Sequence, residues 1–313
     1  MPHWGQVLQE IQAVHATKDP APMDTVRRKY LALLAQKRGR NVIAYYSGWL
    51  QNPGPRYAYQ ASINDADMNA FMAVMQGLDR KKGLDILLHT PGGGMSATES
   101  LINYLHKMFD GNIEAFVPQI AMSAGTMIAC CCKKIHMGKQ SSIGPIDPQI
   151  NGVPAYGVIK EFKDALVRIK KDSAAIPLWQ VIIGKYHPTL LGECRNAINL
   201  AREIVRKRLE EVMFFDEPRS AAARKAKKIV NCLNEHNKSN KVHDRHIDMT
   251  KAAGFGLKIE PLEQDNELQD LVLTVHHCYI HAFSSSIALK ITENHRGTAL
   301  INSASPLPLP RNA

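Results

Sequence analysis

The chain has 313 residues, of which 45% are hydrophobic and 22% charged, so it can bury one large core and is not a disordered protein. Its formal charge of +10 would suit a nucleic-acid partner. The basic clusters at 202–208 and 224–228 alternate with apolar residues, however, as on a solvated helix face, and no nucleic-acid-binding motif accompanies them. We therefore expect no nucleic-acid partner.

Residues 1–14 lack the basic start and the unbroken apolar segment of a secretory signal. The longest apolar stretches, such as 120–132, are shorter than the roughly 18 residues that span a bilayer. Six cysteines, including an adjacent run at 130–132, contain no C-x-x-C pair, so we expect reduced and mostly buried thiols. These features predict a cytoplasmic protein without a membrane span.

The first part of the chain predicts an N-terminal helical segment over residues 1–40, with an amphipathic helix at 24–38. Strands and helices then alternate up to residue 138. Such alternation implies mostly parallel strand pairing with helices packed outside the sheet. Strands are predicted at 41–49, 84–89, 113–117 and 134–138, and helices at 65–78, 97–108 and 124–132.

Beyond residue 149 the pattern becomes mainly helical. A short stretch at 257–260 is the exception, because it could pair as an edge strand. The predicted organisation is an α/β core over 41–175 and a mainly helical C-terminal region over 176–313 that completes the fold. The helices of the second half are predicted at 155–171, 189–215, 218–234 and 268–293.

The first segment that could carry chemistry is L-L-H-T-P-G-G-G at 87–94, where a strand runs into a proline and three glycines. Glycines let the backbone turn sharply and leave N–H groups free to face a bound oxygen, as oxyanion stabilisation requires. A phosphate cradle or a simple tight turn has the same composition. The spacing matches neither G-x-G-x-x-G nor G-x-x-x-x-G-K-[ST].

The second segment is V-P-Q-I-A-M-S-A-G-T at 117–126, where small residues surround Ser123 at the start of an apolar helix. A serine in this position can act as a nucleophile that the helix start and close backbone approach assist. The alternative is that Ser123 only caps the helix, since serine is a favoured N-cap residue.

The motifs H-T-P-G-G, A-M-S-A-G-T-M-I-A and M-G-K-Q-S-S-I-G-P-I-D-P-Q-I, taken together and in this order, resemble the serine dehydrogenase proteinase family. This family is part of the Clp protease/crotonase-like superfamily and is related to Clp protease and signal peptide peptidase A. The resemblance runs from about residue 27 to about residue 297. It implies an α/β, Clp/crotonase-like core of repeated strand-strand-helix units.

The same resemblance implies a nucleophile and an oxyanion hole, carried here by Ser123 and by the backbone N–H groups of Gly93 and Ala124. It also implies an acid and a base in the order Ser, Asp, His, which match Asp147 and His243. Clp protease itself has a histidine where this chain has Asp147. No dinucleotide fingerprint is present, so the family's name carries no dehydrogenase chemistry.

The identity of the base stays open at this point. Asp147 could instead form an Asx-type turn before Pro148, and His246 competes with His243 in the same polar segment. A desolvated lysine serves as the base in other branches of the superfamily, and Lys160 or Lys163 could do so here. Both lie among acidic residues that favour the charged amine.

His277 and His281 stand four residues apart on a predicted helix, which is a spacing that zinc sites use. No H-E-x-x-H pattern accompanies them, and their apolar neighbours indicate core or interface histidines. We therefore expect neither a metal nor a cofactor.

The sequence as a whole predicts a serine peptidase that acts on a peptide or protein substrate through an acyl-enzyme. Members of the superfamily usually form rings or stacked oligomers, so a homo-oligomer is expected. Two alternatives remain: a non-catalytic scaffold or partner-binding protein of the same fold, and an acyl-CoA enzyme of the crotonase type. Ser123 argues against the second, because crotonases typically place acids beside the substrate.

Overall fold

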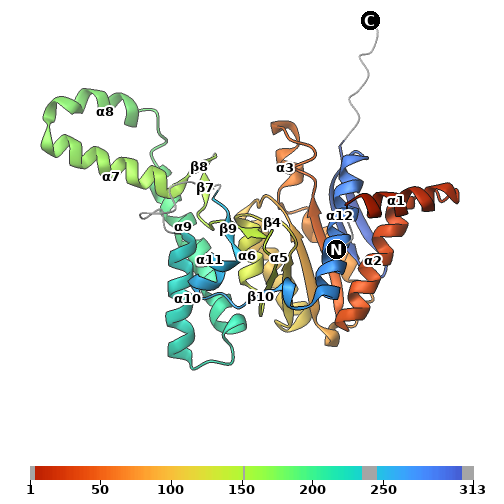
Figure 1. Ribbon diagram of the computed structural model, residues 1–313. Coiled ribbons are helices and arrows are strands. Elements are labelled where there is room, and N and C mark those ends of the chain that lie inside the picture. The colour runs from red at the N-terminus through yellow and green to blue at the C-terminus, as the bar shows by residue number, and fades with distance from the viewer. Residues whose placement is uncertain (1–3, 151, 235–244, 305–313) are drawn as a thin grey trace, which may run out of the picture.

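The computed structural model describes residues 4–150, 152–234 and 245–304. Its centre is a seven-stranded β-sheet with helices packed on both faces (Figure 1). Five neighbouring strands, from β10 to β1, pair in parallel, and β11 and β12 extend the sheet in antiparallel pairing. In spatial order the strands are β10 (Ile259–Pro261), β5 (Ile135–Met137), β3 (Ile113–Val117), β2 (Leu84–His89), β1 (Asn41–Ser47), β11 (Ala288–Asn294) and β12 (Ala299–Ser303).

The predicted α/β class and the mostly parallel core are confirmed. The short stretch predicted as an edge strand is β10, which pairs with β5 at one edge of the sheet. The helix predicted over 268–293 is wrong in its last part, because α12 ends at Ser284 and β11 follows from Ala288. Every residue of β11 is buried between β1 and β12, and this burial outweighs the helical periodicity.

Two apolar cores lie on opposite faces of the sheet. One face is covered by α2 and α12, with α1 packed against both. The other face is covered by α4, α5, α6, α9 and α10. The helices are α1 (Trp4–Ala16), α2 (Pro22–Arg38), α3 (Ala58–Ala61), α4 (Asp67–Met75), α5 (Met95–Phe109), α6 (Ala124–Cys130), α9 (Leu190–Arg208), α10 (Arg219–Asn234), α11 (Met249–Phe255) and α12 (Asn266–Ser284).

Two further helices, α7 (Ala155–Lys171) and α8 (Ile176–Ile183), extend away from the sheet and form an arm on one side of the molecule (Figure 1). At the base of this arm, α7 packs against α9. Two small sheets lie beside the main sheet, and the second leads into α7. They consist of β4 (Ile120–Ala121), β6 (Ser142–Ile143) and β9 (Ile247–Asp248), and of β7 (Gln149–Ile150) with β8 (Val153–Pro154).

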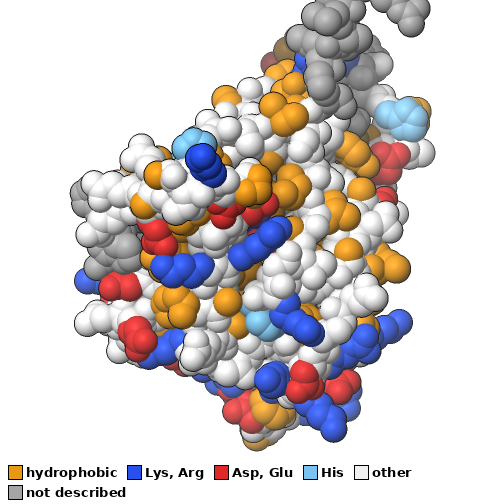
Figure 2. Space-filling model, turned by 90° about the vertical axis from the view of Figure 1, so that its right-hand side faces the viewer, with side chains coloured by type: hydrophobic (Ala, Val, Ile, Leu, Met, Phe, Trp, Pro, Cys, Tyr) orange, Lys and Arg blue, Asp and Glu red, His pale blue; other side chains and the backbone are white. Residues whose placement is uncertain are grey.

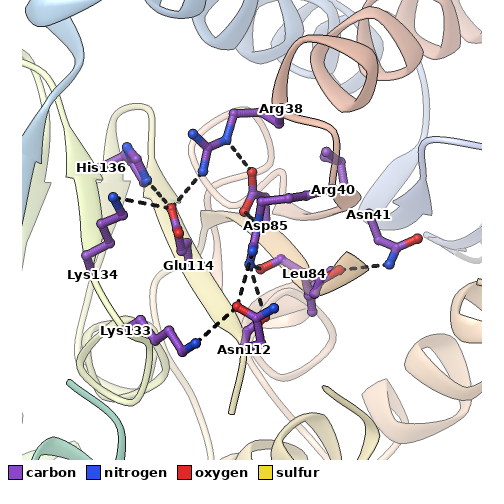
Figure 3. A network of polar contacts seen from close by, with 12 residues as sticks. Arg38, Arg40, Asn41, Leu84, Asp85, Asn112, Glu114, Lys133, Lys134 and His136 are labelled. Carbon is purple, nitrogen blue, oxygen red and sulfur yellow. Dashed lines mark hydrogen bonds and ion pairs between the residues drawn. The ribbon is translucent and has the colours of Figure 1, made fainter. Parts of the chain in front are cut away.

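A polar network occupies the amino-terminal ends of the parallel strands (Figure 3). Arg38 Nε and Arg40 Nε donate to the carboxylate of Asp85 at 2.6 and 2.5 Å. Arg38 Nη2 also donates to Glu114 Oε2 at 2.7 Å, and His136 Nε2 lies 2.7 Å from the same oxygen. The network pairs charges that would otherwise be buried alone, and it leaves the carboxyl ends of the strands for other chemistry.

The net positive charge is not gathered on the face formed by α1, α2 and α12. Figure 2 shows lysine and arginine side chains interspersed with acidic ones across that face. Lys29 Nζ lies 2.7 Å from Glu10 Oε1, and Lys37 pairs with Glu267. Surface charges that alternate in sign do not form the continuous basic stripe that nucleic-acid binding requires.

Candidate active site

The two glycine- and serine-bearing turns meet at the carboxyl ends of β2 and β3. The backbone N–H of Thr90 donates to the carbonyl of Ile120 at 3.2 Å, and the N–H of Met122 donates to the carbonyl of Thr90 at 3.0 Å. This parallel pairing of Thr90 with Ala121 holds the turn after β2 against the turn that carries Ser123. The structure therefore brings together the two segments that are 30 residues apart in the motifs.

The absence of a side chain at Gly92 lets the two turns approach each other closely. A Cβ atom on residue 92 would lie 2.9 Å from the Ser123 Cβ and 3.1 Å from the Ala124 nitrogen. The φ of Gly92 is +102°, a conformation that residues with a side chain rarely adopt. Glycine is required here because both the space and the backbone conformation exclude a side chain.

Gly93 is packed on its other side against Ile63. The N–H of Ile63 donates to the carbonyl of Gly92, and the N–H of Gly94 donates to the carbonyl of Ile63, both at 2.8 Å. Within the described residues, the N–H groups of Gly93 and Ala124 donate no hydrogen bond. The first N–H groups of a helix have no partner inside that helix, which applies to Ala124.

Ser123 has an unusual backbone conformation, with φ of 49° and ψ of −112°. A non-glycine residue in such a sparsely populated conformation costs about 1–3 kcal/mol, and strain of this kind clusters at active sites. Although Ser123 occupies the N-cap position of α6, its side chain makes no capping hydrogen bond within the described chain. The Ser123 side chain therefore does not act as a capping group for α6 within the described chain.

A cavity of about 310 Å³ opens at Ser123. Its walls combine the two turns with apolar side chains and with the loop that follows β6. The cavity therefore brings the Ser123 side chain and the glycine turn to one space. The residues lining it are Ser62, Pro91, Gly92, Gly93, Gly94, Met95, Ser123, Ala124, Met127, Ile146, Pro148 and Gln149.

Asp147 is buried, with 1% of its surface exposed, and lies between two residues of the cavity wall, Ile146 and Pro148. Burial raises the pKa of Tyr156, and the charge of Asp147 raises it further, so the ring at the start of α7 lies near this carboxylate. No sequence pattern pointed to Tyr156.

The candidate bases differ in placement. His243 lies outside the described residues. His246 is exposed and directly precedes β9. Lys160 has 72% of its side chain exposed and pairs with Asp164 one helical turn away, while Lys163 is also exposed. Neither lysine is buried, whereas a lysine that acts as a base is typically desolvated.

A buried lysine that the sequence did not indicate contacts the segment that packs against the glycine turn. Lys290 on β11 donates to the carbonyl of Ser62 at 2.7 Å and pairs with Asp67 Oδ1 at 2.8 Å. Burial lowers the pKa of Lys290, and the charge of Asp67 opposes this shift. These contacts fix the Ser62–Ile63 segment against Gly93. Lys290 lies in the stretch predicted as helix, so its role could not be seen from the sequence.

The described residues contain no group of three or more His, Cys, Asp or Glu side chains placed to hold a metal ion. His277 and His281 contact the ring of Trp4 instead, with ring centroids 5.6 and 3.8 Å apart. Five of the six cysteines are buried and Cys232 is half-buried, as expected for packing residues. None of the described helices combines the length and apolar character needed to cross a bilayer.

A parallel sheet flanked by helices, with a serine at a strand-to-helix turn beside a glycine loop, defines the ClpP-like class of α/β proteins. A family model described as "ClpP-like SDH-type serine proteinase" matches residues 21–272. The chain belongs to this family, as its motifs predicted. Serine proteolysis is thus the activity associated with the family as a whole.

Two relatives come from Methanocaldococcus jannaschii. The first, named uncharacterized protein MJ0137, is 26% identical over 242 residues, which cover 76% of this chain and 74% of the relative. The second, uncharacterized protein MJ1495, is 35% identical over 79 residues, or 25% of this chain and 27% of the relative. Neither name states an activity.

Proposed function

We propose that the protein hydrolyses peptide bonds through an acyl-enzyme formed on Ser123. The observation that carries the proposal is the left-handed backbone of Ser123, whose side chain lines a cavity beside the Gly92–Gly93 turn. In the first step Ser123 Oγ bonds to the substrate carbonyl carbon, its proton passes to a base, and the amine leaves with that proton. Water then releases the acyl group by the reverse sequence.

Gly93 and Ala124 are proposed to hold the oxyanion through their backbone N–H groups. Both residues line the cavity, and neither N–H has a hydrogen-bond acceptor within the described chain. Two donors aimed at one oxygen stabilise the charge that develops as the tetrahedral intermediate forms.

His243 is proposed as the base, with Asp147 orienting its ring. Two backbone contacts, one on each side of the segment that carries His243, support this assignment. The N–H of Ile146 donates to the carbonyl of Leu233 at 3.1 Å, and Ile247 pairs with Ile143, whose other neighbour is Ala121. The described chain on either side of residues 235–244 thus lies beside the strand that leads to Ser123, which supports a base from this segment.

Covalent trapping of Ser123 by a fluorophosphonate tests the nucleophile. An adduct at Ser123 also separates the enzyme from the alternative of a non-catalytic scaffold, because an unactivated serine does not react. We further propose a cytoplasmic location and a peptide or protein substrate.

Replacing Gly93 by proline is expected to impair hydrolysis more than folding. Proline removes the N–H that the proposed oxyanion hole uses, and loss of one such donor costs about 10²–10³ in kcat. Any side chain at position 93 also crowds Ile63, since a Cβ there would lie 2.2 Å from the Ile63 carbonyl oxygen. Hydrolysis rates and thermal melting curves are measured for each variant.

Gly93→Ala is the matched control, because it introduces the same contact with Ile63 but keeps the N–H group. The further loss of kcat in Gly93→Pro relative to Gly93→Ala reports on the removal of the donor together with the change of φ from +159° that proline imposes. A folded Gly93→Pro variant that retains the native kcat would remove Gly93 from the oxyanion hole.

The arm formed by α7 and α8 is proposed to join copies of this chain into a homo-oligomer. The arm extends from the body (Figure 1) and exposes apolar side chains on both of its helices. Leu166 and Val167 are 61% and 66% exposed, and Leu178 and Val181 are 62% and 64% exposed. Apolar surface concentrated on a projecting element is typical of a protein–protein contact.

Val181→Asp is expected to shift the protein from oligomer to monomer, because a charge cannot be buried without a partner in an apolar interface. Size-exclusion chromatography with light scattering measures the mass. Gln180→Asp introduces the same charge at an adjacent exposed position and is expected to leave the assembly intact. An unchanged mass for Val181→Asp would exclude α8 from the subunit contact.

A further inference from the structure

A second pocket adjoins the Ser123 cavity and is formed by the loop between β1 and α4. Its volume is about 280 Å³, and it shares two wall residues, Ser62 and Pro91, with the cavity. Pro91 directly precedes Gly92, which contacts Ser123. The pocket and the cavity are therefore adjacent and share part of their wall next to the turn that contacts Ser123.

The lining of this pocket is mostly apolar. None of the described residues that line it carries a charge. The other residues of the wall are Trp49, Asn52, Pro53, Gly54, Tyr57, Ala58 and Ala61.

The wall of the pocket is already formed by contacts within the chain. The Trp49 ring packs on the buried His89 ring with 4.5 Å between centroids, and the guanidinium of Arg56 lies 5.3 Å above the Tyr57 ring. The hydroxyl of Ser47 donates to the carbonyl of Ala61 at 2.7 Å. A pocket held by such contacts loses little conformational entropy when it is filled.

We propose that this pocket binds an aliphatic or aromatic side chain of the peptide substrate, close to the bond that Ser123 attacks. The inference rests on the proposed peptidase function and adds a substrate class to it. A pocket smaller than the roughly 300–1,000 Å³ of sites for whole small ligands suits one or two side chains. Its uncharged wall excludes aspartate and glutamate side chains, which would lose their hydration there without gaining a partner.

The test uses internally quenched peptides that differ at one position at a time, with Gly, Ala, Leu, Phe or Asp on either side of the cleaved bond. The native protein is expected to cleave Leu and Phe peptides at least about tenfold faster, in kcat/KM, than Asp or Gly peptides at one position. Ala58→Leu fills the pocket and is expected to remove this preference at that same position.

Gln60→Leu is the matched control, because residue 60 lies on the neighbouring exposed surface of the same segment and does not line the pocket. It is expected to keep the native preference. Tyr57→Ala widens the pocket and is expected to shift the preference from Leu toward Phe. This second variant covers the case in which Ala58→Leu disturbs the loop.

Labelling of Ser123 by a small alkyl fluorophosphonate distinguishes failure of the pocket assignment from failure of the proposed peptidase function. A variant that still labels at the native rate but has lost its preference for Leu and Phe supports the pocket assignment. Native labelling with unchanged preference in Ala58→Leu and Tyr57→Ala overturns the pocket assignment and leaves the peptidase function standing. Absence of both labelling and cleavage in the native protein overturns both.

Discussion

A fluorophosphonate is expected to modify Ser123 and no other serine of the native protein. The Ser123 Oγ bonds to phosphorus, fluoride leaves, and the hydroxyl proton passes to the base. The two N–H donors of Gly93 and Ala124 stabilise the adduct as they would the tetrahedral intermediate. Peptide mass spectrometry after digestion locates the modification, and Ser123→Ala is expected to lower hydrolysis by on the order of a thousandfold or more.

Ser62 provides an internal control for this experiment. It lines the same cavity, but its hydroxyl donates to the carbonyl of Ala58 at 2.6 Å, as an ordinary structural serine does. Equal modification of Ser62 and Ser123 would mean that access alone governs the reaction. A folded, assembled protein that neither labels at Ser123 nor cleaves any peptide would favour the scaffold alternative.

The second large effect is expected from His243→Ala, which removes the proposed base. Without a base the serine hydroxyl keeps its proton near neutral pH, so acylation is expected to fall by on the order of a thousandfold or more. Acylation is measured as the initial burst of product, with the pH profile of hydrolysis recorded alongside.

His246→Ala and Lys160→Ala are the controls for this variant. His246 is an exposed histidine three residues further along the chain, and Lys160 is an exposed lysine paired with Asp164. Both variants are expected to keep most of the activity. Retained acylation in His243→Ala together with its loss in Lys160→Ala would instead assign the base to lysine.

The parallel core could be predicted because each strand is short, apolar and bounded by turn residues. The predicted strands at 84–89 and 113–117 match β2 and β3, and the predicted helix at 155–171 matches α7. β11 could not be found in the same way. Its sequence includes Lys290 and Glu293, whose burial depends on partners far away in the chain, namely Asp67 and Arg27.

The candidate site also has features that the sequence could predict and features that it could not. Motif order was enough to bring the turn at Gly92–Gly93 next to Ser123, since the carboxyl ends of neighbouring parallel strands lie together. The left-handed φ of Ser123 has no signature in residue type, because it results from the packing of the turn around it. The side pocket at Trp49 and Tyr57 depends on how an irregular loop folds back, which no periodic pattern describes.

The polar network at the opposite end of the sheet has a consequence for acid tolerance. Burial would raise the pKa of Glu114, but the hydrogen bond and charge of His136, together with the charges of Arg38 and Lys134, lower it to about 2. A carboxylate whose pKa is depressed from 4.5 stabilises the fold fully above that pH and loses this contribution progressively as the pH falls from 4.5 through about 2. Mild acid above pH 4.5 is therefore expected to leave this part of the framework intact.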